Sequence, residues 1–85
     1  MLYDEAKLHE LLNLYSGKLP DELLHQLGHD IRAQLNNIIG NMQLVKLSLT
    51  SDNFTAEDQR SFVEEVIDAS RMIDLIIEAG LKSRK

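Results

Sequence analysis

The segment 24–49 constrains the fold most, because its apolar residues recur with the period of an α-helix. Successive apolar positions are three or four residues apart: Leu24, Leu27, Ile31, Leu35, Ile38, Met42, Val45 and Leu49. Such a series places one continuous apolar stripe on a helix whose other face is polar. Pro20 suits a first helical position, and Asp21 and Glu22 suit the positive end of the helix dipole. We therefore expect a long amphipathic helix over about residues 20–49.

Two further helices are predicted on either side of this segment. A short helix covers residues 4–15 and is ended by the Ser16-Gly17 pair. A second long helix covers about residues 56–81 and begins at a capping box made by Thr55 and Asp58. Gly80 is expected to mark the beginning of its C-terminal end. No strand-like alternation is present, so the expected fold class is all-α.

The two long helices are joined by the short polar segment 50–53, so they should run antiparallel as a hairpin. We divide the chain into a short N-terminal helix and linker, residues 1–18, and a helical hairpin, residues 19–85. Residues 1–18 could either cap the end of the bundle or extend as a linker.

The composition predicts association with a second copy. The chain has 85 residues, 44% of them hydrophobic, but only two Phe, two Tyr and no Trp, so one hairpin can build only a small aliphatic core. A lone hairpin would leave its Leu and Ile stripes in water. We therefore expect a homodimer that closes a four-helix bundle.

Gly40 lies inside the predicted long helix, where glycine costs about 1 kcal/mol relative to alanine. It can mark a close helix contact or a flexible point, or it can be a glycine that is merely tolerated.

The charge pattern excludes several classes of protein. The formal net charge is −5, and basic residues cluster only in the short tail 82–85, which argues against a nucleic-acid partner. No apolar run approaches the roughly 18 residues that a bilayer span needs, so we expect a cytoplasmic chain without membrane contact. The absence of cysteine excludes disulfides, thiol catalysis and thiolate metal sites.

His29 is predicted to face water, because it lies two residues from both Leu27 and Ile31 and is therefore turned about 160° from the apolar stripe. An exposed helical histidine is most often only a surface residue. His25 lies four residues earlier, a spacing that can place two imidazoles on one metal. No convincing third and fourth ligand accompanies the pair, so no metal site is predicted.

The residues around this histidine resemble a known motif. The segment Leu27-Gly28-His29-Asp30-Ile31-Arg32-Ala33-Gln34-Leu35-Asn36-Asn37-Ile38-Ile39-Gly40 is similar to the phospho-acceptor box of sensor histidine kinases. The turn and the later segment Arg71-Met72-Ile73-Asp74-Leu75-Ile76-Ile77 resemble the rest of that family's dimerisation and histidine-phosphotransfer domain. The resemblance covers about two-thirds of the chain and leaves out the first 18 residues.

This resemblance implies a role in two-component signal transduction. His29 would carry the phosphoryl group, Asp30 would orient and stabilise its ring, and Arg32 matches a position that is usually basic. The phosphoryl group would come from an ATP-binding kinase domain, in cis or in trans, and pass to an aspartate in the receiver domain of a response regulator.

Two positions depart from the family pattern. Ala33 replaces a Thr or Asn that is thought to position water for dephosphorylation, so phosphatase activity is not expected. Gln34 replaces a proline that usually bends the helix, so the kink should be weaker or absent.

Nothing in the chain resembles a nucleotide-binding box, so it should not phosphorylate itself unaided. We expect no cofactor in this chain, because ATP and Mg²⁺ would be bound by a separate catalytic domain. The alternative is a non-catalytic dimerisation or inhibitory module that binds a histidine kinase or a response regulator.

Overall fold

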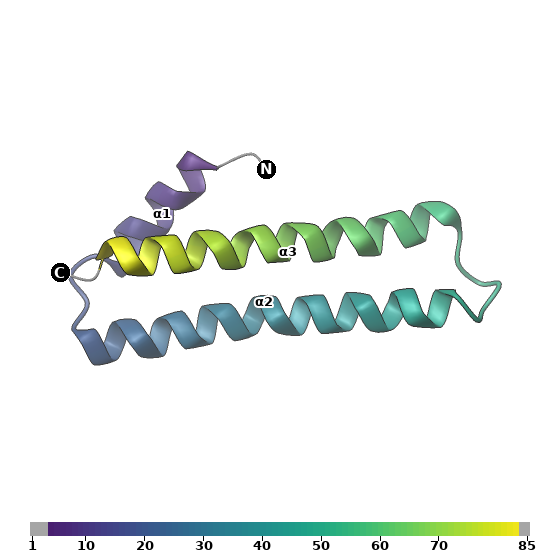
Figure 1. Cartoon of the computed structure of the whole chain (residues 1–85), viewed down its shortest axis with the longest axis horizontal. Coiled ribbons are helices and arrows are strands. Elements are labelled where there is room, and N and C mark those ends of the chain that lie inside the picture. Colours follow the sequence, from purple (N-terminus) through teal and green to yellow (C-terminus); the bar gives the residue numbers. More distant parts are fainter. Residues whose placement is uncertain (1–3, 84–85) are drawn as a thin grey trace.

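The computed structural model describes residues 4–83, and these residues form three α-helices and no strand. They are α1 (Glu5–Tyr15), α2 (Pro20–Ser48) and α3 (Ala56–Ser83). Figure 1 shows α2 and α3 lying antiparallel over their length, with α1 beside the end where α2 begins and α3 finishes. The predicted all-α architecture with two dominant antiparallel helices is confirmed.

The helix starts follow from local side-chain chemistry. The Asp4 carboxylate accepts a hydrogen bond from the backbone N–H of Lys7 at 3.0 Å and caps α1. At α3, the N–H of Asp58 donates to Thr55 Oγ1 and the N–H of Thr55 donates to Asp58 Oδ2, both at 3.0 Å. This reciprocal pair is the predicted capping box, which is therefore confirmed.

The glycines have different roles, and only Gly80 departs from the expectation. Gly17 follows α1 with a φ of +80°, the left-handed conformation that a helix stop commonly requires. Gly80 was expected to begin the end of α3, but the helix continues to Ser83, so that prediction is wrong. Gly80 is instead buried against α2, where an added Cβ would lie 2.7 Å from Cδ1 of Leu27. At Gly40 an added Cβ would have no neighbour within 4 Å. This favours the interpretation that Gly40 is merely tolerated over the interpretation that it marks a close helix contact.

The apolar stripe of α2 is wider than the surface that α3 covers. Buried or half-buried positions recur at the alternating spacing of a helix seam: Leu27, Ile31, Gln34, Ile38, Asn41, Val45 and Ser48. The apolar neighbours Leu35, Met42 and Leu49 remain 43%, 47% and 74% exposed. One side of the apolar stripe of α2 therefore packs against α3, and the other side, with Leu35, Met42 and Leu49, stays open to solvent; we call it the open face.

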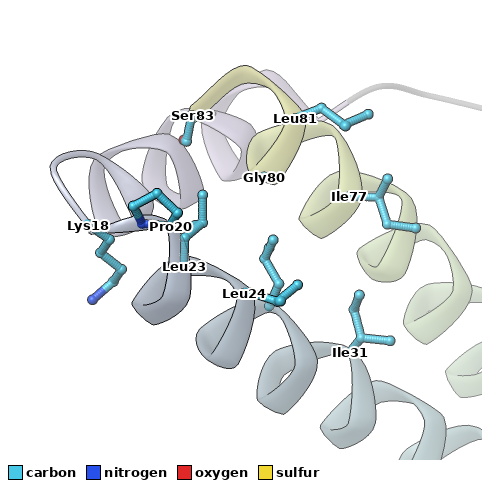
Figure 2. A pocket seen from close by; sticks show the side chains of 10 residues that line it. Lys18, Pro20, Leu23, Leu24, Ile31, Ile77, Gly80, Leu81 and Ser83 are labelled. Carbon is cyan, nitrogen blue, oxygen red and sulfur yellow. The ribbon is translucent and has the colours of Figure 1, made fainter. Parts of the chain in front are cut away.

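The open face includes a groove between α2 and α3 at the end of the hairpin where α2 begins and α3 finishes. Figure 2 shows Leu24 and Ile31 of α2 facing the groove together with Ile77 and Leu81 of α3. The groove has a volume of about 540 Å³, and Leu24 is 71% exposed beside it. A second apolar surface would remove these side chains from water.

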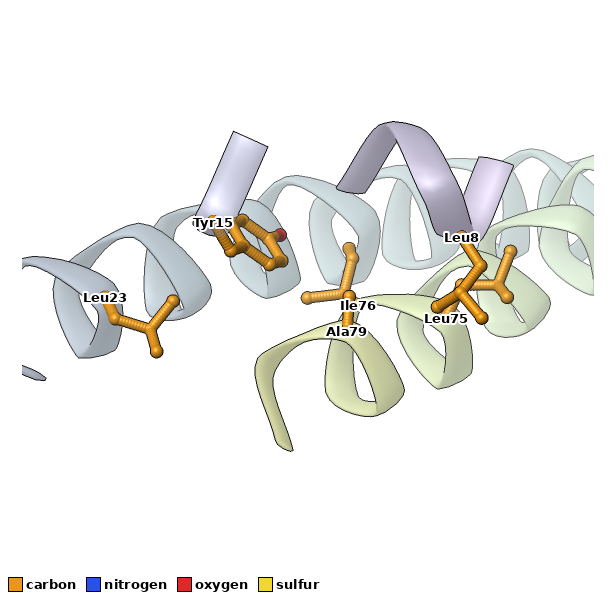
Figure 3. Close-up of a cluster of buried hydrophobic side chains, with 6 residues drawn as sticks. All are labelled: Leu8, Tyr15, Leu23, Leu75, Ile76 and Ala79. Carbon is orange, nitrogen blue, oxygen red and sulfur yellow. The ribbon is translucent and has the colours of Figure 1, made fainter. Parts of the chain in front are cut away.

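A compact apolar cluster lies at the same end of the hairpin, where α1 packs. Its buried members are Leu8, Tyr15, Leu23, Leu75, Ile76 and Ala79 (Figure 3). α1 supplies two of them, Leu8 and Tyr15, so residues 5–15 pack on the hairpin and do not extend away from it as a linker.

The opposite end of the hairpin is held by polar and aromatic contacts. The Gln59 amide donates to the Ser48 hydroxyl at 3.1 Å, which joins the end of α2 to the start of α3. Phe54 and Phe62 pack edge to face, with ring centroids 5.8 Å apart and planes inclined at 73°. These contacts fix the connection between the two long helices.

Across residues 4–83, no helix carries an apolar stretch of the length that a bilayer crossing requires.

Candidate functional site

His29 lies on the solvent side of α2, nine residues after the first residue of the helix. Its side chain is exposed, as its rotation away from the apolar stripe predicts. His25, one turn earlier on the same helix, is also exposed. The chain therefore offers a second histidine in a similar position for comparison with His29. An exposed imidazole with a free ring nitrogen can act as a nucleophile towards an incoming phosphorus atom.

Asp30 is half-buried, and both of its carboxylate oxygens accept hydrogen bonds. The Tyr15 hydroxyl donates to Oδ2 at 2.6 Å, and the Gln26 amide donates to Oδ1 at 2.9 Å. The hydrogen bonds of this carboxylate are thus made with α1 and with the preceding turn of α2, while His29 lies next to it on the outer surface.

The Tyr15 hydroxyl is a stable donor in this contact. Burial raises its pKa well above the ordinary value, and the hydrogen bond to Asp30 and the negative charge of that carboxylate raise the pKa further. Tyr15 therefore keeps its proton at neutral pH and continues to donate to Asp30.

Sequence reasoning missed both partners of Asp30. Gln26 lies four residues before Asp30, a spacing that places the two side chains side by side on a helix, so this contact had a local signal. Tyr15 lies 15 residues from Asp30, and their contact depends on α1 folding back onto the hairpin. No local pattern indicates that fold-back.

A shallow cavity of about 420 Å³ adjoins the carboxylate between α1 and the hairpin. Its charged lining residues besides Asp30 are Lys7 and Glu10 of α1, which form an ion pair at 3.3 Å. Ala33 and Gln34, the two departures from the family pattern, also line it. α2 continues through Gln34 without an interruption of its helical hydrogen bonding.

The third predicted site residue, Arg32, is exposed one turn after His29. Residues three apart on a helix are neighbours on its surface. The Arg32 guanidinium can therefore reach a negatively charged group attached to the His29 ring.

No group of three or more His, Asp or Glu side chains that could hold a metal is found in the described part of the chain, residues 4–83.

Searches of protein-family models, curated proteins and solved structures found no match to this chain. The resemblance to histidine kinases stays a prediction from the residues quoted for it.

Proposed function

We propose that this chain is the dimerisation and phospho-acceptor domain of a two-component histidine kinase, and that His29 carries the phosphoryl group. The observation that carries the proposal is the exposure of His29, the histidine of the acceptor-like segment, on the outer side of a long hairpin helix. Most exposed helical histidines lack such a sequence context.

In the proposed reaction, a neutral ring nitrogen of His29 attacks the γ-phosphorus of ATP held by a separate kinase domain. The new N–P bond forms as the bond from phosphorus to the bridging oxygen breaks and ADP leaves. The proton on the other ring nitrogen can pass to Asp30 or to water, and Arg32 stabilises the added negative charge. Transfer to a receiver-domain aspartate then restores the free imidazole.

The open apolar face supports the proposed homodimer. Beside the seam to α3, α2 carries a second line of exposed apolar side chains at seven-residue spacing: Leu35, Met42 and Leu49. This spacing is typical of a helix seam, and α3 adds the exposed residues Val63, Ile67, Ile77 and Leu81. A second copy would bury these side chains in a four-helix bundle.

The experiment incubates the full chain with a complete histidine kinase and ATP, and separately with phosphoramidate as a small phosphoryl donor. We expect an acid-labile, base-stable phosphate that is lost in His29→Gln and retained in the matched control His25→Gln. A phosphate that survives in His29→Gln, or no phosphate from either donor, would contradict the proposal. Adding a receiver domain and following the phosphate then tests the relay.

One observation favours the alternative, a non-catalytic module that binds a kinase or a regulator. The hydrogen bonds that Asp30 makes within residues 4–83 go to Tyr15 and Gln26 and not to His29, so the carboxylate is oriented by α1 and the preceding turn of α2 in this arrangement. A chain that binds a kinase or receiver domain tightly, yet takes no phosphate on His29, would establish this alternative.

A further inference from the structure

Tyr15 is the residue through which α1 reaches the candidate site. Its ring is fully buried in the apolar cluster with Leu8 and Ile76, so packing fixes where its hydroxyl lies. That hydroxyl donates to Oδ2 of Asp30 at 2.6 Å, a short bond of the kind made to a charged acceptor. The orientation of the Asp30 carboxylate is therefore tied to the docking of α1.

The carboxylate is engaged on both sides. Gln26 donates to Oδ1 at 2.9 Å, so the two donors together hold the carboxylate plane and spread its charge over two hydrogen bonds. A hydrogen bond from the neighbouring imidazole of His29 would have to be added to these two or replace one of them. A carboxylate held in this way is a weaker acceptor for an imidazole N–H than a free one.

α1 is the element of this fold that is most easily released. It has 11 residues, of which only Leu8 and Tyr15 are buried, and a helix of this length is marginal by itself. Detaching α1 would leave the extensive contact between α2 and α3 in place.

We infer that Tyr15 is a positioning residue that acts through Asp30: with α1 docked, its hydroxyl holds the carboxylate away from His29 and lowers the reactivity of the imidazole. Release of α1 returns the carboxylate to His29. The consequence for phosphoryl transfer rests on the proposed function, whereas the effect on imidazole reactivity does not.

The test compares the full chain with Tyr15→Phe, which keeps the buried ring and removes only the donor. The first readout is the carbethoxylation rate of each histidine with diethyl pyrocarbonate, followed by mass spectrometry at about pH 8, where an imidazole of ordinary pKa near 6.5 is neutral. We expect the rate at His29 relative to His25 to rise about threefold, a small part of the 10²–10⁴-fold that a positioned base contributes. The second readout is the rate of phosphorylation by phosphoramidate, which should rise in parallel.

Asp30→Asn supplies the decisive control, because the inferred effect passes through that carboxylate. On the Asp30→Asn background, Tyr15→Phe should leave the ratio of the His29 to the His25 rate unchanged. Leu8→Ala, which loosens α1 but keeps the hydroxyl, should raise the ratio in the otherwise native chain. Circular dichroism confirms that each variant remains helical.

An unchanged ratio in both Tyr15→Phe and Leu8→Ala, or a rise that persists without the Asp30 carboxylate, would overturn the inference. If the ratio rises but no donor phosphorylates His29, the proposed function fails and the positioning role stands. If His29 is phosphorylated at one rate in all variants and the ratio is constant, the positioning role fails and the proposed function stands.

Discussion

Tyr15 and Asp30 join two helices through one short hydrogen bond, and at the scale of single residues this bond is also a source of stability. A hydrogen bond to a charged group contributes about 1.5–3 kcal/mol. Because Asp30 is half-buried beside a shallow cavity, water can replace part of the lost bond, so the expected cost lies in the lower part of this range.

We predict that Tyr15→Phe lowers the free energy of unfolding at pH 7 by about 1–2 kcal/mol, since the hydrogen bond is lost and the packing is kept. The pH dependence should also change. Folding raises the pKa of Tyr15, so the folded state holds this proton more tightly than the unfolded chain, whose tyrosine titrates near 10. The contribution is therefore fully present below about pH 10 and is lost as the pH rises from there towards the higher pKa of the folded state.

Urea unfolding followed by circular dichroism at pH 7 and at about pH 11 measures this difference. The wild-type chain should lose more stability over that interval than Tyr15→Phe, in which the group is missing. Equal losses in the two proteins would show that Tyr15 does not titrate differently in the folded state.

Two of the three glycines inside the long helices have opposite surroundings. Gly40 in α2 has open space where a Cβ would be, whereas Gly80 in α3 lies against Leu27. The same substitution should therefore have opposite effects at the two positions.

We predict that Gly40→Ala raises the free energy of unfolding by up to about 1 kcal/mol through helix propensity alone. Gly80→Ala should lower it by about 1 kcal/mol, because overpacking of about 1–3 kcal/mol exceeds the same gain in propensity. Denaturant unfolding of the two variants measures whether each substitution raises or lowers the free energy of unfolding. A stabilising Gly80→Ala would show that the Leu27 side chain moves aside at little cost.

The capping box of α3 supports another prediction at this scale. Thr55→Ala removes the acceptor for the N–H of Asp58 and should cost about 1 kcal/mol, while Thr55→Ser keeps an acceptor and should cost little. Thermal unfolding of the two variants compares them, and equal melting temperatures would contradict a stabilising cap.

The helices and their starts could be predicted from the sequence because caps, glycine stops and apolar periodicity are local signals. Which side of the α2 stripe faces α3 could not, since Gln34 and Leu35 are both compatible with a helix seam. The exposure of His29 followed from rotation about one helix, whereas the Tyr15 contact to Asp30 required the tertiary placement of α1. Gly80 was misread because a glycine near a helix end and a glycine at a close helix contact look alike in one sequence.

At the scale of the whole molecule, the dominant feature is an apolar face that one copy of the chain leaves uncovered. Thirteen large apolar side chains are exposed within residues 4–83, and many of them belong to α2 and α3. A contiguous exposed apolar patch is typical of an association surface, and the groove lined by Leu24, Ile77 and Leu81 is where such side chains of α2 and α3 gather.

We predict that Leu35→Glu converts a dimer into a monomer, because it places a charge in the middle of the proposed seam. Gln43→Glu adds the same charge at an exposed position outside the apolar stripe and should leave the dimer intact. Sedimentation equilibrium of both variants measures the mass in solution. A wild-type chain that sediments as a monomer at every concentration would contradict the proposed bundle.

α1 and the open groove involve different faces of the hairpin, since the residues that line the groove and those that line the cavity under α1 do not overlap. The proposed self-association and the docking of α1 therefore use mostly different side chains, although Leu23 belongs both to the groove and to the cluster under α1. Dilution would act on the proposed association, whereas a ligand that captured α1 would act on its docking, so in the proposed dimer a stimulus would reset the chemistry of each subunit while the two copies stay together.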